Sequence, residues 1–193
     1  MTPLRTTPAL TAREAAEVIL VDARRQPALR VPLDDALDSV LAVDVVSPVD
    51  IPARTNSAMD GYAARADDVR PATADAPVRL RVVEVLPAGA APVRAIRAGE
   101  CARIFTGGVL PDGADSVVRQ EDTDLGADVV TITSGRDAGV NIRQAGEDIR
   151  QGTTVLRDGT ALGPAHLGVL ASLAVSHPLV YRRPRLAILA SGD

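Results

Sequence analysis

The sequence predicts an α+β fold, with helices toward both ends and a small β-rich body, a barrel or a sandwich, between them. Three observations predict this fold. Apolar residues recur at helical spacing after Thr11 and again after Pro164. From Val78 onward the periodicity is two, in short segments that turn residues separate. At 193 residues the chain is long enough for one large domain or two small ones.

The N-terminal part predicts two helices and a strand. Thr11 and Glu14 form a capping-box pattern, in which each side chain can bind the other residue's backbone N–H group. We expect the helix that follows to stop before Pro27. Residues 32–39 predict a second short helix, and residues 41–47 predict a strand.

The middle of the chain predicts several short strands. Val78, Leu80 and Val82 alternate with arginines, which is the pattern of a strand with one buried face. Clusters of Gly, Pro and Asp separate the runs that follow, and short strands with regular turns are typical of a small barrel or sandwich. The further β-like runs are 101–106, 115–120, 128–133 and 149–156.

The C-terminal part returns to a mixed pattern. Pro164 suits the first turn of a helix, and residues 177–181 predict a strand. Residues 186–190 form an unbroken apolar run, the pattern of a parallel strand that is buried on both faces. Such a strand needs neighbouring strands and crossover helices, so we expect it to be the first strand of an α/β domain that this chain does not complete.

Composition excludes several classes of function. The formal charge is −4, there is no Lys, and the arginines are scattered, so we expect no nucleic-acid partner. Cys101 is the only cysteine, which excludes an internal disulfide, and we expect it to be a small buried hydrophobic residue. With two histidines, a zinc site is not expected. The chain has no bilayer-spanning apolar run and no signal-peptide pattern, which predicts a cytoplasmic protein without membrane contact.

Residues 55–63, TNSAMDGYA, concentrate polar side chains between two runs of β-forming residues. We expect a loop, in which Asp60-Gly61 makes a tight turn with a positive φ at Gly61 and projects the Asp60 side chain. Asp, Asn and Ser also bind nearby backbone groups in ordinary turns, so a purely structural loop is the alternative.

Two further loops carry candidate chemistry. A strand runs into Thr106-Gly107-Gly108, where a hydroxyl beside backbone amides suits an anionic ligand; a plain turn is the alternative. In the second loop, Glu147 and Asp148 offer oxygen ligands for Mg²⁺, and Arg143 can bind a phosphate. The alternative for this loop is a surface ion pair between Arg143 and Glu147.

Taken together and in this order, these loops resemble the molybdopterin molybdenumtransferases, the MoeA family that includes the E domain of gephyrin. The departures are Gly108, where the family commonly has Ala, Asp38-Ser39, which replaces a common Gly-Arg, and Ala190, where Ser or Thr is usual. The matching stretches are 56–63, 104–108, 110–115, 146–148, 164–172, 183–186 and 190–193.

The resemblance implies an organisation in regions. Residues 1–50 and 141–183 are expected to form an elongated, discontinuous, mixed α/β first region. Residues 51–140 are expected to form the inserted β-barrel-like region, and residues 184–193 to begin the α/β domain that receives the pterin. Family members act as dimers, with a cleft to which both subunits contribute, so the resemblance also implies a homodimer.

The resemblance further implies an activity and a site. The family uses Mg²⁺ to hydrolyse adenylylated molybdopterin, inserts molybdenum from molybdate, and releases AMP. The expected partners are the molybdopterin adenylyltransferase and the apo-molybdoenzymes, and the truncated chain itself is expected to be inactive or nearly so. The implied catalytic residues are Asp60, Thr106 and Asp148, with Asp60 and Asp148 also as metal ligands and with Ser57, Gly107, Gly108, Arg143 and Asp193 as substrate or anion contacts.

A second hypothesis from another class is a non-catalytic dimerisation or scaffolding module of the same family. The acidic residues Asp60 and Asp148 favour the enzyme, because a scaffold has no physical need for them. A dinucleotide-binding enzyme is not expected, since no G-x-G-x-x-G follows a predicted strand.

Overall fold

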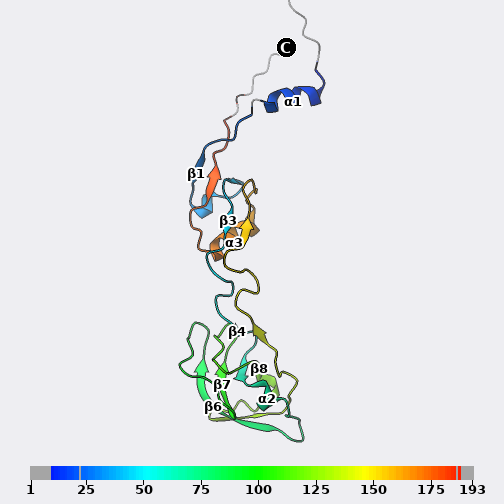
Figure 1. The fold of residues 1–193 in the computed structure, drawn as a ribbon, viewed down its shortest axis with the longest axis vertical. Coiled ribbons are helices and arrows are strands. Elements are labelled where there is room, and N and C mark those ends of the chain that lie inside the picture. Colours follow the sequence, from blue (N-terminus) through cyan, green and yellow to red (C-terminus); the bar gives the residue numbers. More distant parts are fainter. Residues whose placement is uncertain (1–9, 22, 186, 188–193) are drawn as a thin grey trace, which may run out of the picture. The chain divides into compact units, whose positions relative to one another are not determined.

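The computed structural model describes residues 10–21, 23–185 and 187 (Figure 1). The chain divides into two compact units. The first contains the residues up to Val45 and those from Leu156 onward, and the second spans Val46–Val155. The expected insert, residues 51–140, lies within the second unit. Of the predicted strand 186–190 only residue 187 is described, so this prediction is not tested, and the predicted contact Asp193 lies outside the described residues.

The first unit contains a small antiparallel sheet with the strand order β1-β12-β2. Its buried apolar residues include Leu41, Leu162, Leu170 and Val180. The elements are α1 (Ala12–Val21), β1 (Ala28–Arg30), the 3-10 turn η1 (Leu33–Asp35), β2 (Val40–Leu41), α3 (Pro164–Ser172) and β12 (Leu179–Tyr181).

Both predicted helix starts in this unit are confirmed. The Thr11 N–H donates to Glu14 Oε2 at 2.8 Å, and the Glu14 N–H donates to Thr11 Oγ1 at 3.3 Å. Pro164 begins α3, and the Gly163 N–H donates to Nδ1 of His166 at 3.0 Å, so this histidine caps the helix. None of the α1 side chains is buried.

The predicted helix at residues 32–39 is wrong, because only the turn η1 forms there. Asp38 adopts a φ of 59°, which a continuing helix does not allow. The predicted strand 41–47 is divided into two short strands, β2 and β3 (Val45–Val46), because β2 pairs with β12 whereas β3 pairs with β11. Of the predicted strand 149–156, only β11 (Thr154–Leu156) forms, and it pairs with β3.

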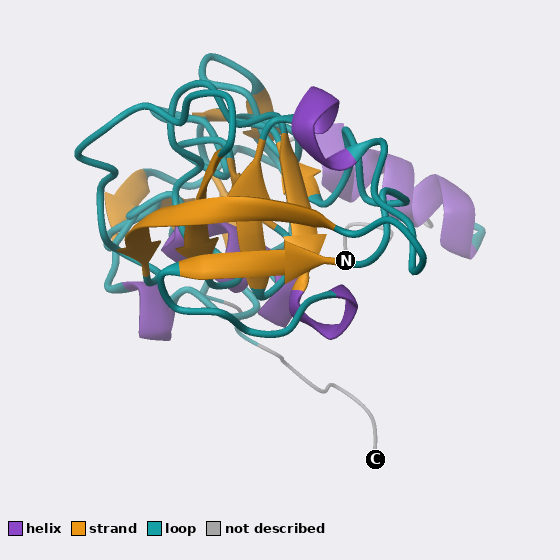
Figure 2. Ribbon diagram, turned by 90° about the horizontal axis from the view of Figure 1, so that it is seen from below, coloured by secondary structure: helices purple, strands orange, loops and turns teal. Residues whose placement is uncertain are grey.

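The second unit is built on a five-stranded sheet with the order β8-β5-β7-β6-β9. Figure 2 shows that its strands curve rather than lie flat. The strands β6 and β7 pair in parallel and the other neighbours are antiparallel, while β4 pairs with β10. The elements are β4 (Asn56–Ser57), β5 (Gly61–Ala64), α2 (Ala66–Val69), β6 (Val78–Leu86), β7 (Glu100–Ile104), β8 (Ser116–Arg119), the 3-10 turn η2 (Gln120–Asp122), β9 (Val129–Ile132) and β10 (Ile142–Arg143).

Both faces of this sheet are covered by apolar side chains. Tyr62, Cys101 and Val118 belong to the cluster on one face, and Ala63 and Val117 belong to the cluster on the other. As the scarcity of aromatic residues requires, Val, Leu, Ile and Ala fill most of both clusters. The strand β5, which lies between β8 and β7, is therefore buried along its whole length.

The prediction that residues 55–63 form a loop is wrong for residues 56–57, which form β4, and for residues 61–63, which belong to β5. Gly61–Ala64 form the strand β5, and all four residues are buried. Gly61 does not have a positive φ; a Cβ at this position would collide with the backbone carbonyl oxygen of Val118. A strand that is buried on both faces shows no alternation, and small residues here let β8 approach closely.

Candidate functional site

The candidate site is formed where β5 begins and β7 ends. Gly61 lies opposite Ile104 in the antiparallel pair, so the residue before β5 and the loop after β7 come together. The Thr106 N–H and the Thr106 hydroxyl both donate to Oδ1 of Asp60, each at 2.8 Å. The backbone and hydroxyl hydrogen bonds from Thr106 hold the pKa of Asp60 below its ordinary value. An exposed, ionised carboxylate is thus fixed at the point where β5 begins.

The glycine amides after Thr106 are used inside the protein. The Gly107 N–H donates to the Ser57 carbonyl oxygen at 2.8 Å, and the Gly108 N–H donates to the Phe105 carbonyl oxygen at 2.8 Å. The Ser57 N–H in turn donates to the Gly108 carbonyl oxygen at 2.9 Å. The Gly107 and Ser57 amides therefore join the two loops, and the Gly108 amide closes a turn within its own loop. The predicted role of the two glycine amides as anion donors requires that these hydrogen bonds break.

Ser57 holds its own loop closed. Its side chain is fully buried, its hydroxyl donates to the Met59 carbonyl oxygen at 2.6 Å, and it accepts the Met59 N–H at 3.2 Å. Met59 packs against one apolar face of the sheet, and Tyr62 is buried in the other. These contacts on both sides of Asp60 keep its backbone in place. Direct binding of a ligand by Ser57 stays a prediction.

Arg143 and Asp148 lie on the segment that pairs with the Asp60 loop. In β10, Arg143 lies opposite Asn56, and its side chain is exposed. The alternative of an Arg143–Glu147 ion pair is wrong, because these described residues make no such contact and Glu147 instead accepts the Gln144 N–H at 2.8 Å. The Asp148 N–H donates to the Ile51 carbonyl oxygen at 3.0 Å, and its side chain is exposed.

The residues fit a Mg²⁺ ion held through few protein ligands. Oδ1 of Asp60 accepts both Thr106 hydrogen bonds, and Oδ2 accepts none from the described residues. Mg²⁺ keeps several waters and takes only one or two carboxylates, so Oδ2 is a suitable ligand. Within the described ranges, no three His, Cys, Asp or Glu side chains gather as a metal site. Asp148 as the second ligand stays a prediction.

Arg103 is the site residue that sequence reasoning missed. Its guanidinium carbon lies 5.0 Å from the ring centres of both Tyr62 and Phe105. Its Nη2 donates to Oε1 of Gln120 at 2.7 Å, and the Gln120 N–H donates to the Asp60 carbonyl oxygen at 3.0 Å. The signal was the alternation within 101–106, which places residues 103 and 105 on the face opposite that of Ile104.

Comparison with known proteins identifies the family. The family described as “MoeA N-terminal region (domain I and II)” matches residues 10–174. The chain belongs to this family. A molybdopterin molybdenumtransferase from Nostoc sp. strain PCC 7120 is 38% identical over 192 residues, which cover 97% of this chain and 44% of that relative.

Two further relatives agree. The molybdopterin molybdenumtransferase 2 of Mycobacterium tuberculosis strain CDC 1551 is 40% identical over 165 residues, which cover 86% of this chain and 41% of the relative. The crystal structure of the molybdopterin biosynthesis MoeA protein from Pyrococcus horikoshii OT3 has a TM-score of 0.80 and 36% identity, over 87% of this chain and 45% of that chain. This MoeA N-terminal region therefore spans less than half the length of these relatives.

The matched range contains every predicted site residue of the MoeA N-terminal region except Asp193.

The prediction for Cys101 is confirmed, since it is buried and its burial raises the pKa of the thiol to about 12, which excludes a reactive thiolate. In the described part of the chain, no helix has both the length and the apolar character needed to cross a membrane.

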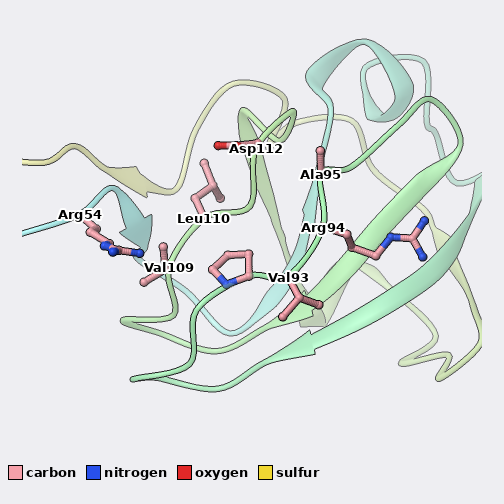
Figure 3. A pocket seen from close by; sticks show the side chains of 8 residues that line it. Arg54, Val93, Arg94, Ala95, Val109, Leu110 and Asp112 are labelled. Atoms are coloured by element: carbon pink, nitrogen blue, oxygen red, sulfur yellow. The ribbon is translucent and has the colours of Figure 1, made fainter.

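A recess of about 300 Å³ next to β4 is a competing site in this MoeA N-terminal region (Figure 3). Arg54 and Arg94 both line it, but Figure 3 shows the Arg94 side chain directed away from Arg54. The Arg94 guanidinium lies 3.5 Å from Oε1 of Glu100, an oxygen that also pairs with Arg81. The recess therefore lacks a convergent pair of cations, and the Asp60–Thr106 site remains the stronger candidate.

Proposed function

We propose that this chain takes part in molybdenum cofactor biosynthesis as part of a Mg²⁺-dependent molybdopterin molybdenumtransferase. The single observation that carries the proposal is the Asp60–Thr106 arrangement, in which two donors hold one carboxylate oxygen and leave the other available. The family membership and the names of the relatives support it. The substrates are adenylylated molybdopterin and molybdate.

The first chemical step is hydrolysis of the adenylate. A water molecule attacks the phosphorus of the adenylyl group, the P–O bond to the pterin phosphate breaks, and AMP leaves with the oxygen of the water. Asp60 orients this water, whose proton passes to the solvent, and Thr106 fixes the carboxylate so that little reorganisation is needed. A Mg²⁺ ion bound at Asp60 supplies neutralisation of the charge on the phosphate. The two thiols of the freed pterin then bind the molybdenum of molybdate, and one oxo ligand leaves with their two protons as water.

The whole activity needs more protein than this chain. The matched segments are 44% and 41% of the two relatives. We propose that the part of the enzyme beyond these segments binds the pterin. We propose that two copies form a homodimer in which each supplies part of a shared cleft, with Arg143 and Asp148 on the substrate side. The molybdopterin adenylyltransferase supplies the substrate, and apo-molybdoenzymes receive the product.

The test is a chimera in which residues 1–193 replace the matching part of the Nostoc relative. AMP release is measured with adenylylated molybdopterin, molybdate and Mg²⁺. We expect Asp60→Asn to lower the rate on the order of 100-fold, because the variant loses the carboxylate that positions the attacking water and the metal ion. Asp112→Asn is the matched control, because Asp112 is an exposed carboxylate of the same unit. Equal rates in the chimera and its Asp60→Asn variant would reject the catalytic role and favour the scaffolding alternative.

A further inference from the structure

A recess of about 290 Å³ adjoins the Asp60 site on the second unit. Pockets for small molecules begin at about 300 Å³, so its size suits a mononucleotide-sized ligand rather than a dinucleotide. Arg103 and Gln120 belong both to this recess and to the hydrogen bonds around Asp60. Its lining residues are Tyr62, Val85, Arg103, Gln120, Leu125, Gly126 and Ala127.

Arg103 is a half-buried cation whose charge helps to lower the pKa of Asp60 but which forms no ion pair with a carboxylate of the described residues. Of the three half-buried arginines in residues 46–155, Arg65 and Arg119 each have a carboxylate within 4.0 Å. Arg103 has none among the described residues. Its guanidinium is held in place by the Tyr62 and Phe105 rings. A preoriented guanidinium without a carboxylate is suited to an oxyanion, above all to phosphate.

Gln120 adds a second donor to the same edge of the recess. Its Oε1 already accepts a hydrogen bond from Arg103 at 2.7 Å. Its side-chain NH₂ group has no partner within the described ranges. The Tyr62 hydroxyl is used, since it donates to the Gly126 carbonyl oxygen at 3.1 Å. The free polar groups contributed by Arg103 and Gln120 are therefore donors, which select a ligand rich in acceptors.

Leu125 forms an apolar wall at a strained position. It has a φ of 58°, a region that large side chains rarely occupy, and yet its side chain is 59% exposed. The loop is fixed because Oδ1 of Asp124 accepts the N–H groups of Gly126 and Thr131, at 3.1 and 2.9 Å. Strain of this kind is retained mainly at ligand sites. Val85, 60% exposed, is a second apolar side chain of the recess.

We propose that this recess binds a nucleoside monophosphate, with the phosphate on Arg103 and Gln120 and the base against Leu125 and Val85. The choice of a nucleotide rests on the proposed function, in which AMP leaves beside Asp60. The recess is then the place where the adenylyl group is held before hydrolysis and from which AMP departs. Inorganic phosphate and molybdate share the oxyanion chemistry, so they serve as competing probes.

The first experiment titrates the 193-residue chain with AMP, adenosine, inorganic phosphate and molybdate, and follows the backbone amides by NMR. We expect AMP to shift the amides of residues 103, 120 and 124–127 and to bind at least tenfold more tightly than phosphate. Arg103→Met is expected to weaken AMP binding at least tenfold, and Arg103→Lys to recover part of it. Arg79→Met, which removes an exposed arginine from the same sheet, is the control and leaves binding unchanged.

The second experiment separates binding from folding. In Leu125→Asn the new residue tolerates a positive φ, so the thermal midpoint is expected to stay the same or rise. The apolar wall is lost, so AMP binding is expected to weaken about fivefold, whereas phosphate binding does not change. A loss of AMP binding together with a lower thermal midpoint would count against the proposal.

The remaining outcomes are distinct. AMP binding that is the same in wild type, Arg103→Met and Leu125→Asn overturns the site. Equal affinities for AMP and phosphate, or tighter binding of molybdate, overturn the nucleotide and leave an oxyanion site. If the chain does not bind AMP but the chimera shows Asp60-dependent AMP release, the recess is wrong and the proposed function stands. If AMP binds as expected but Asp60→Asn releases AMP at the wild-type rate, the recess stands and the catalytic assignment fails.

Discussion

Two carboxylates of the second unit make an instructive comparison. Asp137 is 2% exposed, and both of its oxygens accept hydrogen bonds from Arg119, at 3.0 and 3.1 Å. Asp60 is exposed, and its hydrogen bonds from described residues, both from Thr106, converge on one oxygen. Both accept a backbone N–H group, from Arg119 and from Thr106 respectively.

The difference separates a structural carboxylate from one available to a ligand. Burial alone would raise the pKa of Asp137, but the hydrogen bonds and charge of Arg119 outweigh it and lower the pKa. The Thr106 hydrogen bonds lower the pKa of Asp60 most, and the charge of Arg103, which forms no ion pair with Asp60, contributes less. Asp137 is therefore neutralised inside the protein, whereas Asp60 keeps its charge and one oxygen for a partner from outside.

The largest expected effect comes from replacing Asp137, the structural carboxylate of the two. Asp137→Ala leaves the Arg119 guanidinium without its main partner and the Arg119 N–H without its acceptor. We expect a loss of about 3 kcal/mol of unfolding free energy, since removal of one partner of a buried pair costs about 3–5 kcal/mol and Arg119 keeps some water contact. Urea denaturation followed by circular dichroism measures it. A loss below about 1 kcal/mol would contradict the structural role of Asp137.

A smaller effect is expected from removing the Thr106 hydroxyl, which positions Asp60, the carboxylate available to a ligand. Thr106→Val keeps the shape of the side chain and the backbone hydrogen bond to Asp60 but removes the hydroxyl donor. We expect AMP release by the chimera to fall about tenfold, with the thermal midpoint unchanged, because the Asp60 carboxylate is less well positioned. Thr133→Val is the control, since its hydroxyl donates to the Asp122 carbonyl oxygen away from the site. Equal losses in both variants would argue against a specific role of Thr106.

Local features of the fold could be predicted from the sequence. The capping box at Thr11, the helix start at Pro164 and the burial of Cys101 depend on residues close in the chain or on residue type. The strand β6 (Val78–Leu86) was found by its alternation. Each of these signals is local, so no knowledge of the sheet order was needed.

Features that depend on strand pairing could not be predicted. Gly61 has the appearance of a turn residue beside Asp60, but the reason for a glycine is the Val118 carbonyl oxygen across the sheet. The amides of Gly107 and Gly108 were expected to face a ligand, and instead they bind carbonyl groups of the protein. Arg103 and Asp137 were missed because only the register shows which rings or cations they meet.

The smallest expected effect is the pH dependence of the stability that Asp137 contributes. The folded-state pKa of Asp137 lies below its ordinary value of 3.8, so its contribution to stability is present above about pH 4 and is lost as pH falls through the folded-state pKa. The difference in unfolding free energy between wild type and Asp137→Ala is therefore expected to be constant from pH 7 to about pH 4.5 and to shrink below pH 3.8. Urea denaturation from pH 7 down to pH 2.5 measures it. A difference that grows with acidification would mean that Asp137 is protonated in the folded protein, and its contrast with Asp60 would then be wrong.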